Sequence, residues 1–315
     1  MIPSRYLLDQ YRPVLDGLNW KHAPRGFSGA EVWRGENEEG NPLFALKKWP
    51  RGFPESRLAE IHCWMMRAVH LPFVPAILHT TSQQSLVRDS GFLWDVTRWM
   101  PGAPLASPTP AEIQIACGAV AKLHSALQVE SRREPCRGVL HRLQIIKDWQ
   151  ANASRLRFSL GTESELSAIF ERAERAVNAC IPSVLEALEP WERPPLPAQP
   201  CVRDLRGEHI LFSAGTVTGI LDFGAAAMDY PGVDLARLLG DLAGDDDAKF
   251  AAGLTAYRSA GGILDEDDQF VRLLERSGAV CSVIGWMFRL GKRLNMAEDA
   301  IAIRSRIATL LDRIE

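Results

Sequence analysis

Two aspartates, Asp204 and Asp222, carry the clearest chemical signal in the sequence. Asp204 stands in "CVRDLRGEHILF" and Asp222 in "GILDFG", and the chain between them reads as two short apolar segments around a Ser-Ala-Gly turn. This pattern is typical of a β-hairpin. Because a hairpin returns the chain to its start, we expect both carboxylates at one end, with His209 beside them. Carboxylates withdrawn from water need a cation or a shared proton, so a divalent metal ion is a natural partner.

Each aspartate alone is more often a turn or cap residue than a ligand. The pair on one hairpin, with a literal Asp-Phe-Gly at the second position, favours a functional site instead.

Two segments near the N-terminus have residue types that suit an anionic ligand. In "RGFSGAEVWRG", the residues Gly26, Ser28 and Gly29 can bring backbone N–H groups to a phosphate before a strand begins. In "FALKKW", Ala45 and Lys47 share one face of a strand by period two. A small residue two positions before a lysine leaves room for a planar ring while the amine reaches an anion.

A helix is predicted in "ESRLAEIHCWMMRAVH", because its apolar residues recur at helical spacing. Glu60 in this helix is the candidate acid to hold the Lys47 amine. Glu55 is the alternative, but it precedes the apolar stripe and is expected at the exposed helix start. The stripe consists of Leu58, Ile61, Met65 and Ala68.

The order of predicted elements indicates an α+β protein in two parts. Residues 1–98 read as short strands with one helix, and residues 99–108 form a Pro/Gly/Ser-rich connector. Residues 109–315 are mainly helical and begin with a capping signal at Thr109 and Glu112. A few strands, including the hairpin, interrupt the helical part.

Composition limits the classes of partner. The net charge of -3 and the absence of a Lys/Arg run argue against nucleic acid. No apolar run reaches the length of a membrane span, and the N-terminus shows no signal-peptide pattern. Six scattered cysteines without a Cys-x-x-Cys pair favour free thiols over zinc or disulfides, which predicts a cytoplasmic protein.

Taken in order, these motifs resemble the aminoglycoside phosphotransferase and choline kinase group of protein-kinase-like phosphotransferases. That group has H-G-D-x-x-x-x-N, a hairpin, an I-D-F/W segment and a downstream D-L-A, and this chain has "VRDLRGEH", the hairpin, "ILDFGAA" and "VDLARLLG". The resemblance implies a bilobal protein-kinase-like fold, with a small β-rich N-lobe that binds nucleotide, a hinge and a larger helical C-lobe. It also implies transfer of the γ-phosphate of ATP, with Mg²⁺, to a hydroxyl of a small molecule.

The resemblance assigns a role to individual residues. Asp204, with Arg203 before it, takes the place of the catalytic aspartate that accepts or orients the hydroxyl proton. Asp222 takes the place of the aspartate that holds Mg²⁺, and Lys47 with Glu60 resembles the Lys–Glu pair of kinases. The segment "VTRWMPG" resembles the hinge that binds adenine, with Thr97, Trp99 and Met100 as its residues. Asp234 resembles a structural brace of the catalytic loop, and His124 matches a position that is usually a satisfied buried histidine.

The chain departs from the group's pattern at two places. His209 stands where the group has a metal-ligating Asn, and Val202-Arg203 replaces His-Gly. Mg²⁺ prefers oxygen donors to imidazole, whereas Mn²⁺ accepts nitrogen more readily. Three interpretations stay open: an active enzyme with an altered metal site that favours Mn²⁺, an active enzyme in which His209 contacts substrate or phosphate, and an impaired enzyme.

Two alternatives to a small-molecule kinase follow. A catalytically impaired kinase-like protein would bind a nucleotide or metabolite, with His209 as the mark of lost activity. A protein kinase is disfavoured, because "DFG" passes directly to "DYPGVDLA" without an extended activation segment. Neither the acceptor nor the oligomeric state can be predicted from the sequence.

Overall fold

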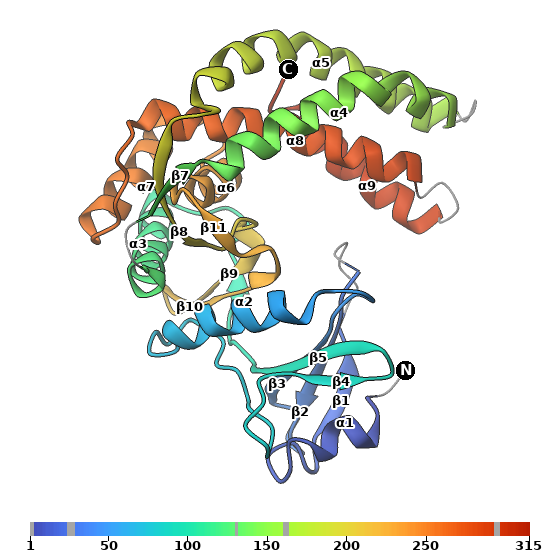
Figure 1. The fold of residues 1–315 in the computed structure, drawn as a ribbon, viewed down its shortest axis with the longest axis vertical. Helices are drawn as coiled ribbons and strands as arrows, with labels where there is room; N and C mark the ends of the chain where they lie inside the picture. Colours follow the sequence, from blue (N-terminus) through green and yellow to red (C-terminus); the bar gives the residue numbers. More distant parts are fainter. Residues whose placement is uncertain (1–2, 24–28, 130–131, 160–163, 293–296) are drawn as a thin grey trace. The chain divides into compact units, whose positions relative to one another are not determined.

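The computed structural model describes residues 3–23, 29–129, 132–159, 164–292 and 297–315. The chain forms two compact units (Figure 1). The first comprises Met1–Ala106, Ser125–Leu127 and Gly207–Ala226, and the second comprises Ser107–His124, Gln128–Arg206 and Ala227–Glu315. The division predicted from the sequence places the hairpin in the helical part, residues 109–315. The contacts of Gly207–Ala226, which contains the hairpin, instead group it with the first unit. The α+β class is confirmed, with an antiparallel sheet in the N-terminal part and helices in the C-terminal part.

A five-stranded antiparallel sheet in the order β1-β2-β3-β5-β4 forms the centre of the first unit. The strands are β1 (Asn19–His22), β2 (Glu31–Glu36), β3 (Pro42–Lys48), β4 (Val87–Asp89) and β5 (Phe92–Arg98).

Period-two alternation divides the side chains of this sheet between its two faces. Trp33, Leu46 and Val96 belong to one buried cluster with Leu7 and Tyr11, from α1 (Arg5–Asp9) and the turns that follow it. The neighbouring residues Ala45, Lys47 and Thr97 point to the opposite face, where they line a cavity. Helix α2 (Glu55–Arg67) buries the predicted stripe of Leu58, Ile61 and Met65, with Ala68 just beyond its end.

The hairpin predicted between the two aspartates is present. Strands β9 (Ile210–Ser213) and β10 (Thr216–Ile220) pair antiparallel, with β6 (Ala103–Pro104) on the other side of β9. Ala214 and Gly215 at the turn have φ of 49° and 75°, the left-handed values that a tight two-residue hairpin turn requires. The Ile220 N–H donates to the Phe73 carbonyl at 2.8 Å, which fixes the end of β10 within the first unit.

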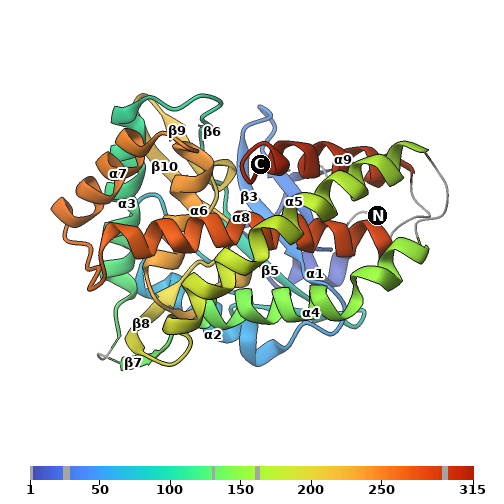
Figure 2. The same ribbon diagram turned by 90° about the horizontal axis from the view of Figure 1, so that it is seen from above.

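Helices dominate the second unit (Figures 1 and 2). Helix α8 packs against α4, α5, α6 and α9, so it is the central element of this unit. The predicted capping box at the start of α3 is present, because Thr109 and Glu112 exchange hydrogen bonds. The helices are α3 (Pro110–Leu127), α4 (Arg137–Ser159), α5 (Ser164–Leu188), α6 (Gly232–Leu242), α7 (Asp247–Ser259), α8 (Asp268–Lys292) and α9 (Ala297–Leu311).

A second small sheet in this unit was not predicted. Strand β8 (Pro195–Cys201) pairs with β7 (Arg132–Pro135) through its first half and with β11 (Ala227–Asp229) through its second half. The prolines of "PPLPAQP" argue against a strand, because a proline cannot donate to a sheet ladder. In the residues described, no helix is both long and apolar enough to cross a bilayer.

Candidate active site

A cavity of about 520 Å³ lies in the first unit, between the sheet, α2, the segment after β5 and the hairpin. This volume is within the range of ~300–1,000 Å³ that is usual for small-molecule sites. The predicted residues Ala45, Lys47 and Asp222 all line it, and so does His209. Most of the wall is apolar, so the few polar groups would orient a ligand.

Lys47 is held at the inner end of this cavity by two neighbours. Its ammonium lies 3.0 Å from Oδ1 of Asp222 and 4.3 Å from the centre of the Trp49 ring, a cation–π contact. Lys48 points the other way, with its ammonium 3.2 Å from Glu31 and over the Phe92 ring. The strand therefore delivers only the first of the two lysines to the cavity.

Asp222 lies two residues beyond the end of β10 and has a left-handed backbone, with φ of 57°. Asp tolerates this conformation better than most residues. Burial raises the pKa of Asp222, but the charge and hydrogen bond of Lys47, together with His209, hold it below its usual value. The carboxylate is therefore ionised, as a metal ligand must be.

Asp222 and His209 line the cavity together and have donor atoms that suit a divalent ion. Oδ1 of Asp222 bonds to Lys47 and, at 3.4 Å, to the Gly224 amide, whereas Oδ2 has no hydrogen-bond partner among the described residues. A carboxylate oxygen fits Mg²⁺ or Mn²⁺, and the imidazole of His209 fits Mn²⁺ better than Mg²⁺.

The predicted pair between Lys47 and Glu60 does not form. Glu60 is exposed and its carboxylate lies 2.5 Å from Arg57 on the same helix, while Lys47 pairs with Asp222. The reason is the helix period: the stripe of Leu58, Ile61 and Met65 turns inward, and Glu60 falls outside it. The alternative, Glu55, contacts Arg88 at the surface.

In place of Glu60, helix α2 contributes a buried histidine, His62, which was not predicted from the sequence. His62 and Asp95 both line the cavity, and Nε2 of His62 lies 3.0 Å from Oδ2 of Asp95. The same oxygen accepts a hydrogen bond from the Trp49 indole at 2.8 Å, and Nδ1 of His62 contacts Ser85 at 2.9 Å. His62 stands four residues after Leu58, so its place on the apolar stripe was a usable signal.

Thr97 in β5 and the two residues that follow this strand, Trp99 and Met100, line the cavity, but they differ in what they offer a ligand. Thr97 lies opposite Ala45 in the pairing of β5 with β3. The Trp99 amide donates to the Leu43 carbonyl at 2.9 Å. Within the described part of the chain the Met100 amide has no such partner, which leaves it able to bond a ligand.

The glycine-containing turn is only partly covered by the structure. Gly26 and Ser28 lie outside the described residues. Gly29 has φ of 76°, a conformation that favours glycine, just before β2.

Asp204 lies in the second unit, on a loop braced by Asp234 of α6. The Asp234 carboxylate accepts hydrogen bonds from the backbone amides of Val202 at 2.7 Å and Arg203 at 2.6 Å. His124 reaches the same carboxylate through Nε2 at 3.1 Å, and its Nδ1 lies 2.8 Å from the Tyr257 hydroxyl. These contacts assign the Nε2–H tautomer, with Tyr257 as the donor to Nδ1.

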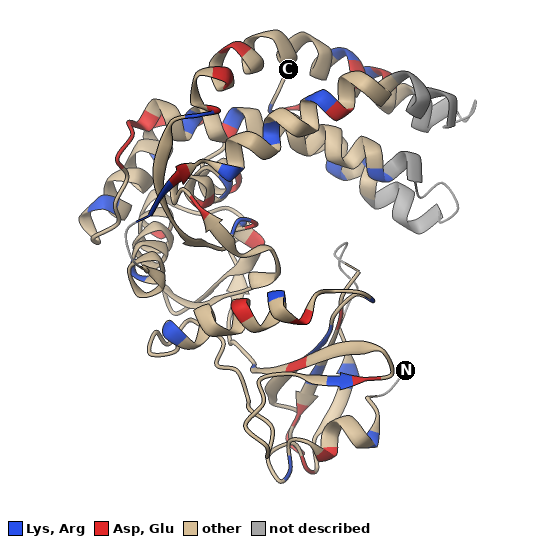
Figure 3. Ribbon diagram, viewed as in Figure 1, with Lys and Arg blue, Asp and Glu red and all other residues tan. Residues whose placement is uncertain are grey.

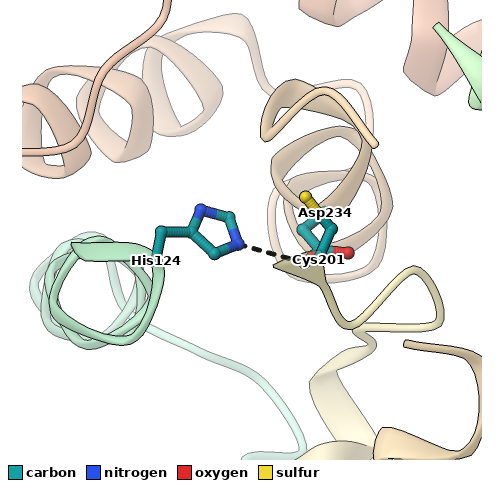
Figure 4. A group of neighbouring side chains, drawn as sticks. All are labelled: His124, Cys201 and Asp234. Carbon is teal, nitrogen blue, oxygen red and sulfur yellow. Dashed lines mark hydrogen bonds and ion pairs between the residues drawn. The ribbon is translucent and has the colours of Figure 1, made fainter. Parts of the chain in front are cut away.

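His124, Cys201 and Asp234 have the residue types of a metal site, and their ligand atoms lie within 4.8 Å of one another (Figure 4). Their donor atoms are already engaged, because Asp234 accepts three hydrogen bonds and both His124 nitrogens are in contact. Burial raises the pKa of the Cys201 thiol well above its usual value, which disfavours the thiolate that a metal requires. The cluster is therefore a structural brace.

Arg203 adopts a left-handed backbone with φ of 67°, a conformation that costs a non-glycine residue about 1–2 kcal/mol. Its guanidinium lies 3.1 Å from the buried Asp229, at an angle that does not make a hydrogen bond. Strained residues of this kind gather at functional loops.

The Asp204 carboxylate contacts two guanidinium groups. Nε of Arg206 lies 3.1 Å from Oδ1 of Asp204, and Nη2 of Arg237 lies 3.5 Å from the same atom. Asp204 lines a hollow of about 190 Å³ in the second unit. An ionised carboxylate in such a hollow can accept a proton from a bound hydroxyl group.

Comparison with known proteins identifies the fold and the family of this chain. The spectinomycin phosphotransferase APH(9)-Ia, solved with ADP and spectinomycin, has a TM-score of 0.70 at 12% identity, over 99% of this chain and 98% of that one. The amicoumacin kinase hAmiN, solved with AMP-PNP, Ca²⁺ and Ami, has a TM-score of 0.61 at 14% identity, over 97% and 90%. An aminoglycoside phosphotransferase from Alicyclobacillus acidocaldarius subsp. acidocaldarius DSM 446 has a TM-score of 0.57 at 14% identity, over 99% and 93%.

Sequence identities of 12–14% to these solved structures show that the fold is shared, and they do not show a shared activity. The comparison with curated proteins gave no match. The family model described as the phosphotransferase enzyme family (APH) matches residues 19–274, which is most of the chain. The chain therefore belongs to the APH phosphotransferase family and has its protein-kinase-like fold.

Proposed function

We propose that this phosphotransferase moves the γ-phosphate of ATP to a hydroxyl group of a small molecule. The observation that carries the proposal is the pair of Lys47 and Asp222, 3.0 Å apart at the inner end of the 520 Å³ cavity. An ammonium and an ionised carboxylate beside an apolar wall suit a planar base, a polyphosphate and a divalent ion. The relatives solved with ADP or AMP-PNP support the choice of nucleotide.

The residues of the first unit would bind and orient the nucleotide. The Met100 amide would hydrogen-bond the adenine, and Ala45 leaves space for its ring on the sheet. Lys47 would bind phosphate oxygens. Asp222, with His209, would hold Mg²⁺ or Mn²⁺, which neutralises charge on the phosphates when bound.

Asp204 would act on the acceptor. Its carboxylate would accept or orient the hydroxyl proton, while the brace from Asp234 keeps the loop in place. The transfer would be direct, with no phosphoenzyme, because none of these residues needs to serve as a nucleophile.

Calorimetric titration with AMP-PNP in the presence of Mg²⁺, Mn²⁺ or EDTA tests the nucleotide site. We expect metal-dependent binding to wild type and its loss in Asp222→Asn. Lys48→Met is the matched control for Lys47→Met, because these adjacent lysines point to opposite faces of β3. Absence of binding under every condition would reject the proposal.

His209 supports a second candidate function, a nucleotide-binding protein without transfer activity. Both functions predict nucleotide binding, so turnover must separate them. Release of ADP that depends on an added acceptor and is abolished in Asp204→Asn would support the kinase. Tight AMP-PNP binding with no ADP release across a broad acceptor panel would favour the second function.

A further inference from the structure

Four arginines line the hollow that contains Asp204, against one further acid, Glu275, although the chain as a whole carries a net charge of -3. Lys and Arg are otherwise interspersed with Asp and Glu along the ribbon (Figure 3). In the second unit a hollow of about 160 Å³ adjoins the one that contains Asp204, since Arg237 and Ser282 line both. Its described lining consists of Arg206, Arg237, Ser282, Gly285, Trp286 and Arg289, with no acidic residue among them.

Several guanidinium groups gather around Asp204. Arg206 and Arg237 both contact its carboxylate. Arg142, in the adjoining hollow, donates to the carbonyls of Gly138 and Leu274, and its buried Nε has no partner in the described residues. No carboxylate within the described chain lies in ion-pair range of Arg142, so its charge adds to the field around Asp204.

The titration behaviour of two neighbours agrees with this geometry. Burial lowers the pKa of Arg237, and the charge of Arg206 lowers it further. Burial also lowers the pKa of His141, together with the charges of Arg203 and Arg142. The carboxylates of Asp204 and Asp241 oppose this effect at Arg237, and that of Asp229 opposes it at His141, so burial is the main cause of both shifts.

Several donors in the smaller hollow are positioned for an anion. The Arg237 guanidinium is oriented by the Ser282 hydroxyl at 2.9 Å, and Arg289 stacks over the Trp286 ring at 4.8 Å. Guanidinium groups fixed in this way match the geometry of phosphate and carboxylate oxygens. A Cβ added at Gly285 would meet no atom within 4 Å, so the space beside these donors is open.

We propose that the acceptor is an anion: a small alcohol that carries a phosphate or carboxylate group. Arg206, Arg237 and Arg289 would bind that group in the hollow of about 160 Å³, so that a hydroxyl of the same molecule reaches Asp204. A cationic acceptor would be repelled by the same arginines. This inference rests on the proposed phosphotransferase function and names its substrate class.

Binding can be tested without turnover. Calorimetry with inorganic phosphate and, separately, with malonate on the full chain distinguishes a phosphate site from a carboxylate site. We expect Arg289→Gln to weaken binding of the preferred anion by about 10- to 100-fold, the usual effect of one charge-assisted hydrogen bond. Arg276→Gln is the matched control, because Arg276 is exposed on the same helix and lines neither hollow. Failure of both anions to bind wild type would overturn the inference.

A substitution that fills the hollow gives a second, uncharged test. Gly285→Leu places a side chain in open space, so we expect an unchanged melting temperature and loss of anion binding. Gly118→Ala controls for the effect of removing a helical glycine, because its Cβ would lie 3.8 Å from Ala260, an ordinary contact. Anion binding that survives Gly285→Leu would place the site elsewhere and overturn the inference.

The nucleotide phosphates are the competing occupant of these arginines. Anion titrations repeated with saturating AMP-PNP and metal distinguish a nucleotide-phosphate site from an acceptor site. An acceptor site should still bind the anion when the nucleotide is bound. If AMP-PNP abolishes anion binding, or Arg289→Gln weakens AMP-PNP instead, the hollow serves the nucleotide and the acceptor assignment is wrong. If AMP-PNP never binds, the proposed function fails, and the anion titrations still report on the hollow independently.

Turnover with matched acceptors completes the test. Glycerol against glycerol 3-phosphate, and ribose against ribose 5-phosphate, differ only in the anionic group, while choline and spectinomycin represent cations. We expect ATP-dependent transfer only to anionic members, with an acceptor KM raised about 10- to 100-fold in Arg289→Gln and kcat much less affected. Preferred transfer to the neutral or cationic compounds would overturn the inference.

Discussion

The Lys47 ammonium lies 3.0 Å from a carboxylate oxygen of Asp222, a residue 175 positions further along the chain. This contact joins the five-stranded sheet to the end of the hairpin within the first unit. It also places an ammonium and a carboxylate side by side on the wall of the cavity. Most of the predictions below depend on it or on the brace of the Asp204 loop.

Lys47→Met should weaken AMP-PNP binding by about 10- to 100-fold, because it removes charge-assisted hydrogen bonds to phosphate oxygens. Lys48→Met should change the dissociation constant by less than about twofold, since Lys48 contacts Glu31 on the opposite face. Calorimetry on both variants checks the result. Equal losses of AMP-PNP affinity in the two variants would mean that Lys47 does not bind the nucleotide in preference to Lys48.

The Asp222 carboxyl should titrate below the usual range for Asp in wild type and above it in Lys47→Met. Lys47 is the main group that opposes the effect of burial, and its removal leaves only the weaker lowering effects of His209 and the Gly224 amide against burial. The folded-state pKa is lowered in wild type, so the stabilisation from this ion pair is present above about pH 4 and lost as pH falls through the lowered value. Carbon-detected NMR titration of the carboxyl gives both values. An unchanged pKa in the variant would contradict the assignment.

His209→Asn should shift metal preference from Mn²⁺ towards Mg²⁺, because an amide oxygen replaces an imidazole nitrogen. The measurement is the ratio of AMP-PNP dissociation constants in the two metals, before and after substitution. If the ratio is unchanged while affinity falls equally in both, His209 contacts phosphate or substrate and is no ligand.

Asp234→Asn should lower the free energy of unfolding by about 3 kcal/mol, because a buried amide cannot accept from two backbone N–H groups as a carboxylate does. Tyr257→Phe removes only one hydrogen bond to His124 and should cost about 1 kcal/mol. Urea titrations measure both. A chelator should leave the wild-type midpoint unchanged, whereas a drop would mean that the His124–Cys201–Asp234 cluster holds a metal.

Substitutions at Arg203 should separate backbone strain from the contact with Asp229. Both Arg203→Gly and Arg203→Ala leave the buried Asp229 carboxylate without its cation. Only glycine adopts φ of 67° without penalty, so Arg203→Gly should be more stable than Arg203→Ala by about 1 kcal/mol. Equal stabilities in thermal unfolding would show that the loop relaxes out of the left-handed conformation.

The features that could be predicted from sequence are those fixed by local periodicity. Alternation in "FALKKW" placed Ala45 and Lys47 on the cavity side of β3, and the two apolar segments with their turn gave the hairpin. The order of short motifs indicated the family over most of the chain, although none of these motifs is decisive alone.

The errors arose where long-range packing decides. Glu60 was chosen by analogy, but its place on the helix turns it to solvent, and His62 lies inside instead. Asp95 gave no signal at all, because only the pairing of β3 with β5 brings it beside the Lys47 position. Strand β8 was not predicted because prolines are unusual in a sheet. Its partner strands also lie far away in the sequence, some 60 residues before it and about 30 after it.

The discontinuity of the first unit has a consequence for biosynthesis. Its last stretch, Gly207–Ala226, is translated well after the five-stranded sheet. At ordinary elongation rates the ribosome needs roughly ten seconds to make the intervening chain. During that time the newly made sheet presents Lys47 without Asp222, and the apolar wall of the cavity lacks the hairpin that closes it. The apolar wall of the cavity in the nascent N-terminal segment therefore stays exposed until Gly207–Ala226 has been synthesised.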